Sequence, residues 1–233
     1  MFDARLQPWL RRGFAPLARR LASRGVTADT VTVAGFAVGV AATIAVGLGA
    51  TKTGLVLLLL NRFGDGLDGA LARQLGPTDR GAFLDIALDF AVYALVPLAF
   101  AFADPAHNAL AAAALIASFI GTGSSFLAFA AVAAGRNMKA VTFPTKGIYY
   151  LGGLTEGGET IAAFAAMALW PAGFSVIAWT FAGLCCITTI TRWRQGWIAF
   201  SVNARQSSQA AVPPPDQSCG AAAGSVMKSA MAA

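Results

Sequence analysis

Two pairs of aspartates interrupt the apolar first half of this chain and could hold metal ions. Asp65 and Asp68 are three residues apart, and Asp85 and Asp89 are four apart, so in helices each pair shares one face. An aspartate within a membrane span costs about 2.5–3.5 kcal/mol on insertion scales, so four of them require a compensating partner. Two divalent cations would cancel the four charges. Because the neighbouring donors are oxygens, without Cys or His, we expect Mg²⁺ or Mn²⁺.

The residues around the first pair suggest what such a metal site would act on. Gly66, Gly69, Ala70 and Ala72 are small and leave space beside the carboxylates, and Arg73 stands about a turn beyond them. A metal pair, an arginine and an open groove suit a diphosphate group. The pattern therefore predicts phosphoryl-transfer chemistry.

Three other interpretations of the aspartates stay open at this point. The carboxylates could be salt-bridged to Arg62, Arg73 and Arg80 and serve only to pack helices. They could also line an ion- or proton-coupled transport pathway, because carboxylates within membranes mark transporters too. A catalytically idle membrane scaffold is the third alternative.

The two aspartate pairs must be carried by neighbouring helices to act together. Gly76-Pro77 breaks the helical pattern between them, because proline disfavours helix in the residue before it and glycine accepts unusual dihedral angles. Asp68 lies eight residues before Gly76 and Asp85 eight residues after Pro77. A helical hairpin would therefore bring both pairs to one depth, about two to three turns from its end.

The composition places these helices in a membrane. Apolar residues make up 57% of the chain and charged residues 12%, about half the share typical of soluble domains. Residues 30–50 alone are long enough to cross a bilayer. We predict an all-α membrane protein with six transmembrane helices, at residues 30–50, 53–75, 79–103, 108–134, 147–169 and 172–200.

Basic residues set the expected orientation and divide the chain into three parts. Residues 1–26 alternate leucines with arginines and predict an amphipathic helix on the membrane surface. Lys and Arg near span ends mark the cytoplasmic side, so we expect both termini and the opening of the site in the cytoplasm, with the protein in the inner membrane. Residues 27–202 form the predicted membrane domain. Residues 203–233 are rich in Ser, Ala, Gln and Pro and predict a disordered tail.

The aspartates belong to a longer motif that resembles the signature of the CDP-alcohol phosphatidyltransferase family, D-x2-D-G-x2-A-R-x8-G-x3-D-x3-D. Its matching segments are Asp65-Gly-Leu-Asp68-Gly69-Ala-Leu-Ala72-Arg73 and Gly81-Ala-Phe-Leu-Asp85-Ile-Ala-Leu-Asp89. The segment Thr27-Ala-Asp29-Thr30-Val-Thr32 also resembles the entry to the family's first span. Seven residues separate Arg73 from Gly81 where the pattern has eight, a difference confined to the turn.

The resemblance implies a reaction and a role for each motif residue. Such enzymes transfer a phosphatidyl group from CDP-diacylglycerol to an alcohol in phospholipid biosynthesis and release CMP. All four aspartates would be metal ligands, and Asp89 would also be the general base for the acceptor hydroxyl. The residues expected to contact CDP-diacylglycerol are Gly69, Ala72, Arg73, Thr78 and Gly81, and more weakly Asp29 and Thr30. A homodimer is a further expectation by resemblance, and no nucleic-acid partner is expected.

A second polar group later in the chain is the candidate acceptor site. It comprises Lys146, Glu156, Glu159 and Arg192. The two glutamates would share a helix face and could bind hydroxyls or an amine, whereas the cations could favour a phosphorylated alcohol. Equally, the glutamates could simply pair with nearby cations. The sequence leaves the acceptor alcohol open.

Overall fold

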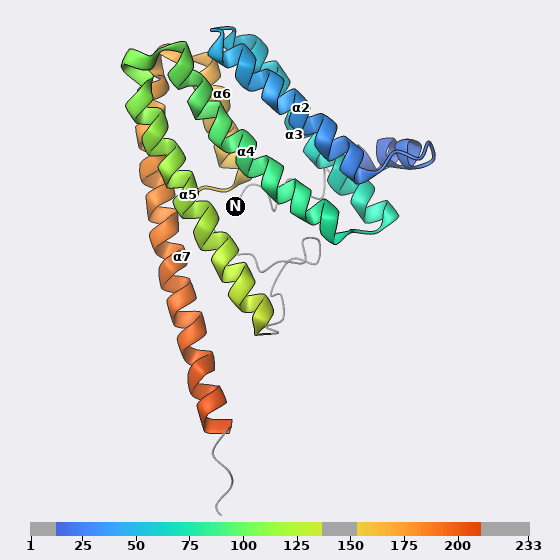
Figure 1. Cartoon of the computed structure of the whole chain (residues 1–233), viewed down its shortest axis with the longest axis vertical. Coiled ribbons are helices and arrows are strands. Elements are labelled where there is room, and N and C mark those ends of the chain that lie inside the picture. The colour runs from blue at the N-terminus through green and yellow to red at the C-terminus, as the bar shows by residue number, and fades with distance from the viewer. Residues whose placement is uncertain (1–12, 137–152, 211–233) are drawn as a thin grey trace, which may run out of the picture. The chain divides into compact units, whose positions relative to one another are not determined.

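The computed structural model describes residues 13–136 and 153–210, with the backbone alone for residues 202–210. Every regular element within these residues is a helix, as predicted (Figure 1). After a helix over residues 13–22, the elements are α2 (Ala28–Gly47), α3 (Thr51–Leu75), α4 (Asp79–Ala103), α5 (Pro105–Gly135), α6 (Gly157–Leu169), the short 3-10 helix η1 (Pro171–Gly173) and α7 (Phe174–Ala210).

Within the described residues, four segments are long and apolar enough to cross a bilayer. They are α2, α4, α5 and the stretch Pro171–Ser201, which joins η1 to part of α7. α3 has 25 residues, but the charges that it carries lower its hydropathy below that of the other four. The described residues thus support several of the six predicted spans, while the full number and the cytoplasmic side of the termini stay predictions.

The fifth predicted span differs from the helix that forms. We predicted helix over residues 147–169, whereas α6 begins at Gly157 and has 13 residues. Residues 153–156 are not helical, because Glu156 has an extended backbone and caps α6. Residues 147–152 and Lys146 lie outside the described residues.

The turn between α3 and α4 forms where the sequence predicted it. α3 ends at Leu75, and Gly76 adopts a φ of 98°, which a residue with a side chain rarely accepts. Thr78 then begins α4, because its hydroxyl accepts a hydrogen bond from the amide of Gly81 at 3.0 Å. The resulting hairpin places α3 and α4 antiparallel, as the predicted site requires.

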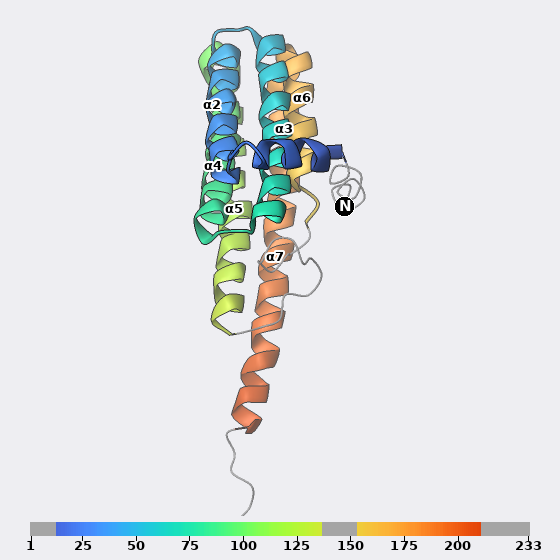
Figure 2. The same ribbon diagram turned by 90° about the vertical axis from the view of Figure 1, so that its right-hand side faces the viewer.

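α2 packs closely against both helices of this hairpin, as Figures 1 and 2 show. Its small residues allow the approach: a Cβ added to Gly39 would lie 2.9 Å from Cγ2 of Val92 in α4. On α3, a Cβ added to Gly54 would lie 2.4 Å from Cγ2 of Val46. Close backbone packing through small residues is the usual way in which membrane helices associate.

An aromatic core joins the later helices to α4. Phe100 of α4 stacks on Phe174 at the start of α7, with ring centroids 4.6 Å apart. Phe164 of α6 is fully buried and meets Phe119 of α5 edge-on. These contacts hold the C-terminal half of α4, away from its aspartates. The polar half of the hairpin packs against α2.

The N-terminal helix lies across α3 (Figure 2). Its Phe14 and Ala18 pack in a cluster with Leu67 and Leu71 of α3. Gly66 makes room for this contact, since a Cβ there would lie 2.6 Å from the Phe14 ring. Gly66 therefore accommodates the N-terminal helix rather than leaving space for a substrate. The arginines of this segment, Arg19, Arg20 and Arg24, are exposed, as an amphipathic surface helix predicts.

α7 extends beyond the predicted last span. The chain divides into two compact units, Met1–Trp193 and Arg194–Ala233, and the final part of α7 belongs to the second. Residues 203–210, predicted as the start of a disordered tail, continue α7 to Ala210. They contain Ala, Arg and Gln, which favour helix, and neither Gly nor Pro. The remainder of the predicted tail lies outside the described residues.

Candidate active site

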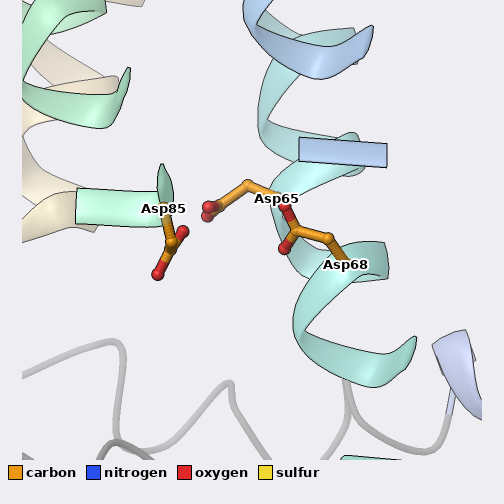
Figure 3. A group of neighbouring side chains, drawn as sticks. All are labelled: Asp65, Asp68 and Asp85. Atoms are coloured by element: carbon orange, nitrogen blue, oxygen red, sulfur yellow. The ribbon is translucent and has the colours of Figure 1, made fainter. Parts of the chain in front are cut away.

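Three of the four predicted aspartates converge. Asp65 and Asp68 project from α3 toward Asp85 on α4, as Figure 3 shows. One carboxylate oxygen from each of the three lies within 4.8 Å of the other two. We call these three residues the aspartate cluster. The matched depth expected for Asp68 and Asp85 from their equal distances to the turn is confirmed, with Asp65 beside them.

The aspartate cluster has the donors that a hard divalent cation prefers. Its three side chains offer carboxylate oxygens, and neither Cys nor His is part of the cluster. Asp68 is buried, while Asp65 and Asp85 are partly buried, so the oxygens are shielded yet accessible. Bare carboxylates this close repel one another, and a cation would relieve that repulsion. The residues present therefore fit Mg²⁺ or Mn²⁺.

Thr32 of α2 orients the most buried member of the aspartate cluster. Its hydroxyl donates a hydrogen bond to Oδ2 of Asp68 at 2.6 Å. Such a bond restricts the orientation of the Asp68 carboxylate. Thr32 lies in the segment that resembles the family's entry, but sequence reasoning gave it no role. The available signal was the position of Thr32 in that segment, one helix turn after Ala28.

Asp89 lies beside the aspartate cluster but is held by an arginine. Nη2 of Arg62 lies 2.5 Å from Oδ1 of Asp89, and Nη1 lies 3.2 Å from Oδ2. Nη1 also lies 3.8 Å from Oδ2 of Asp65. Sequence reasoning named Arg62 only as a salt-bridge partner in the packing alternative. The three-residue spacing to Asp65 was a signal for a site residue that we did not use.

The aspartates and Arg62 line one pocket between α2, α3 and α4. Its lining residues are Thr32, Gly35, Phe36, Asn61, Arg62, Asp65, Asp68, Asp85, Leu88, Asp89 and Val92. This set combines four aspartates with apolar side chains. A pocket of this kind suits an anionic head group bound through cations, with an apolar part beside it.

The predicted nucleotide-binding residues lie on the turn side of the aspartate cluster. A Cβ added to Gly69 would lie 3.4 Å from Nη1 of Arg73, so these two residues are neighbours on α3, with Ala72 a turn after Gly69. Arg73 is exposed. Gly81 is confined, because its added Cβ would lie 3.0 Å from Oδ1 of Asp29. Only glycine fits there without displacing that carboxylate.

Three polar residues predicted near the nucleotide already have partners within the protein. Asp29 forms an ion pair with Arg80, whose Nε lies 2.7 Å from Oδ2. Thr30 shares a hydroxyl hydrogen bond of 2.9 Å with Thr27, and Thr78 caps α4. These contacts shape the turn side of the site, and a direct contact of the three with substrate stays a prediction.

The candidate acceptor residues are only partly brought together. Glu156 and Glu159 form a reciprocal capping box at the start of α6, in which Oε2 of Glu159 accepts from the Glu156 amide at 3.3 Å. Arg192 of α7 is buried and donates from Nη1 to the carbonyl oxygen of Thr122 at 3.0 Å. The glutamates thus have a structural task that the helix-face argument missed, because α6 starts later than predicted.

Comparison with known proteins places the motif in its family. The model of the CDP-alcohol phosphatidyltransferase family matches residues 25–191, which include the aspartate cluster, Asp89 and α2 to α6. The chain belongs to the CDP-alcohol phosphatidyltransferase family. Several of its helices are apolar and long enough to span a bilayer, so this member of the family is a multi-pass membrane protein.

Relatives at the sequence level include one that matches over its whole length. The inner membrane protein YnjF of Escherichia coli K12 is 49% identical over 206 residues, which are 88% of this chain and 100% of the relative. Archaetidylinositol phosphate synthase of Methanothermobacter thermautotrophicus is 43% identical over 84 residues, 36% of this chain and 42% of that protein. This shorter match covers a limited part of both chains.

Solved structures share the fold. Phosphatidylinositol phosphate synthase (PgsA1) of Mycobacterium tuberculosis with CDP-DAG bound has a TM-score of 0.62 and 25% identity, over 80% of this chain and 94% of that one. The same enzyme in complex with manganese and citrate has a TM-score of 0.63 and 24% identity, over 79% of this chain and 88% of that one.

Proposed function

We propose that the protein transfers a phosphatidyl group from CDP-diacylglycerol to an alcohol and releases CMP. The observation that carries the proposal is the convergence of Asp65, Asp68 and Asp85 within 4.8 Å, at motif positions of the family to which the chain belongs. A relative of the same fold has been solved with CDP-DAG bound, which supports the same donor here. The family assignment favours an enzyme over the transporter and scaffold alternatives.

The aspartate cluster would hold divalent cations, Mg²⁺ or Mn²⁺, and Asp89 would complete the ligands for a second one. When bound, such cations neutralise the diphosphate and the departing CMP. Thr32 keeps Asp68 oriented for this task through its hydrogen bond of 2.6 Å. A relative's complex with manganese supports the choice of metal.

Asp89 would act as the general base. It removes the proton from the acceptor hydroxyl, and the acceptor oxygen forms a bond to the phosphatidyl phosphorus. The bond from that phosphorus to the oxygen bridging it to CMP breaks, and CMP leaves with the electron pair. Arg62 donates to both oxygens of Asp89, yet each oxygen keeps a second lone pair that can accept the proton.

The turn side of the site would bind the nucleotide and its diphosphate. Gly69 and Gly81 would give the ligand close access to backbone. Ala72 has a small side chain and would leave room for the ligand beside α3. Arg73 is exposed on this face, and its guanidinium suits bidentate contact with phosphate. Thr78, Asp29 and Thr30 surround the same turn.

The acceptor would meet the cations of the candidate acceptor site. Arg192 is fixed by the carbonyl of Thr122 and by the Phe126 ring, whose centroid lies 5.8 Å from Cζ. With Lys146, it would favour an alcohol that carries a phosphate group. The active site would open to the cytoplasmic side of the inner membrane, where such alcohols and CMP are dissolved.

Release of CMP by the purified protein tests the proposal. CDP-diacylglycerol is supplied with Mn²⁺ or Mg²⁺ and pairs of alcohols with and without phosphate, such as glycerol and glycerol 3-phosphate, or inositol and inositol phosphate. We expect CMP and a new phospholipid, identified by mass spectrometry, and no reaction with a chelator. Absence of CMP with every alcohol, together with ion flux in liposomes that Asp85→Asn abolishes, would support the transporter alternative instead.

A further inference from the structure

Arg62 is held in place by two neighbours besides the aspartates, Asn61 and Tyr93. Its Nε and Nη2 donate to Oδ1 of Asn61 at 3.0 and 2.8 Å. Asn61 is itself anchored, because its Nδ2 donates to the carbonyl oxygen of Gly35 in α2 at 2.9 Å. The Tyr93 ring of α4 lies under the guanidinium, with 5.5 Å from Cζ to the centroid. Arg62 is therefore fixed by Asn61 of α3, which is itself bound to α2, and by Tyr93 of α4. A side chain fixed in this way is preorganised, as a functional cation needs to be.

The position of Arg62 determines that of Asp89. Both oxygens of Asp89 accept from the guanidinium, at 2.5 and 3.2 Å, in the bidentate arrangement that fixes both distance and orientation. The Arg62 side chain is 14% exposed and that of Asp89 32%, so water screens this pair only in part. Asp89 is thereby held against the Arg62 guanidinium, while the three other aspartates face one another.

The charge of Arg62 also reaches the aspartate cluster. Nη1 lies 3.8 Å from Asp65 and 3.2 Å from Asp89. A cation that took both of these carboxylates as ligands would have to enter the space near Nη1 and would be repelled by it. With Arg62 in place, the four aspartates retain three negative charges. One divalent cation leaves a single negative charge, whereas two would leave the empty site positive.

We propose that Arg62 is a positioning residue that substitutes for the second cation until the substrate binds. This inference rests on the proposed function, because it assumes that the aspartate cluster holds metal. One divalent cation binds to Asp65, Asp68 and Asp85 in the substrate-free protein. The second binds together with a diphosphate, whose negative charges compensate the added positive charge. Metal loading and nucleotide binding are then coupled through one side chain.

Counting bound Mn²⁺ tests the coupling without relying on activity. Free Mn²⁺ gives a sharp electron paramagnetic resonance signal that is lost on binding, so a titration of the purified full chain gives number and affinity of sites. CDP serves as the probe because it carries the diphosphate without the lipid. We expect one Mn²⁺ per chain without CDP and two with CDP.

Variants of two arginines separate the proposed role from a general loss of charge. Arg62→Gln should bind two Mn²⁺ without CDP, with the second site tightened at least about tenfold by the loss of the repelling charge. Arg80→Gln is the matched control, since Arg80 also pairs with an aspartate, Asp29, but outside the aspartate cluster. Without CDP it should bind one Mn²⁺, as the unaltered chain does. Melting of Arg62→Gln with and without Mn²⁺ serves as a second readout: without metal it should melt below the unaltered chain, and Mn²⁺ should restore it.

The outcomes distinguish this inference from the proposed function. Two Mn²⁺ in the unaltered chain without CDP, or one in Arg62→Gln, would overturn the role of Arg62, even if CMP release proceeds. One Mn²⁺ in the unaltered chain with CDP would overturn the coupling to the diphosphate. If no Mn²⁺ binds and no CMP forms with any alcohol, the proposed function itself fails.

Discussion

Three carboxylates of the α3–α4 hairpin face one another, whereas polar side chains between α5, α6 and α7 bond to backbone or to each other. In the hairpin, three carboxylates converge within 4.8 Å and repel. In the second region, Arg192 donates to the Thr122 carbonyl, and Thr155 and Thr188 share a hydroxyl hydrogen bond of 3.0 Å. Unfavourable proximity of like charges indicates a site built for a ligand, while polar side chains that bond to backbone or to one another indicate helix packing.

The largest expected difference between the two regions is in catalysis. Asp85→Asn removes one charge from the aspartate cluster and should lower the rate of CMP release about 10³-fold or more, because metal charge stabilisation is worth several kcal/mol. Asp104→Asn is the control: Asp104 accepts from the His107 amide at 3.3 Å at the start of α5, a cap that asparagine also provides. If the rate of CMP release fell equally in Asp85→Asn and Asp104→Asn, the two regions would not differ in their importance for catalysis.

A smaller effect is expected from the hydroxyl that orients Asp68. Thr32→Val keeps the side-chain volume but removes the hydrogen bond, and should weaken Mn²⁺ binding about 10–100-fold, as loss of a ligand's supporting bond does. Thr43→Val is matched to it, since Thr43 is buried on the same helix and donates only to the Val40 carbonyl at 2.8 Å. An unchanged Mn²⁺ affinity in Thr32→Val would show that Asp68 needs no such support.

In the second region, we expect loss of stability without loss of metal affinity. Arg192→Gln removes the bond to Thr122 and the packing on Phe126, and should lower the free energy of unfolding by about 1–3 kcal/mol. Melting in detergent and Mn²⁺ titration measure the two properties separately. A fall in Mn²⁺ affinity as large as that of Thr32→Val would mean that the two regions are energetically coupled.

The smallest effect concerns the capping box of α6. Glu159→Gln keeps an oxygen that can accept from the Glu156 amide, so stability should be unchanged, whereas Glu159→Ala should cost about 0.3–1.5 kcal/mol. The thermal melts of the two variants give this comparison. A higher KM for the acceptor in Glu159→Gln, with stability preserved, would show that the charge serves substrate binding as well as the cap.

Local patterns predicted the hairpin closely. α4 runs from Asp79 to Ala103, the same bounds as the third predicted span, because Thr78 supplies a cap and Gly76-Pro77 excludes helix before it. Both signals act within a few residues and need no tertiary contact. The start of α6 was misplaced by contrast, because the predicted helical pattern runs into Glu156, whose extended backbone makes it the cap that precedes α6.

The sequence alone predicted that the aspartates of α3 and α4 meet, because Asp68 and Asp85 lie equally far from one turn and Asp65 shares a helix face with Asp68. Only the tertiary structure decided how Asp89 is held. Its pairing with Arg62 depends on Asn61, on the carbonyl of Gly35 and on the Tyr93 ring. These groups come from three helices, one of which, α2, lies outside the α3–α4 hairpin. Their distances from the turn therefore do not place them, and their contacts depend on how α2 packs against the hairpin.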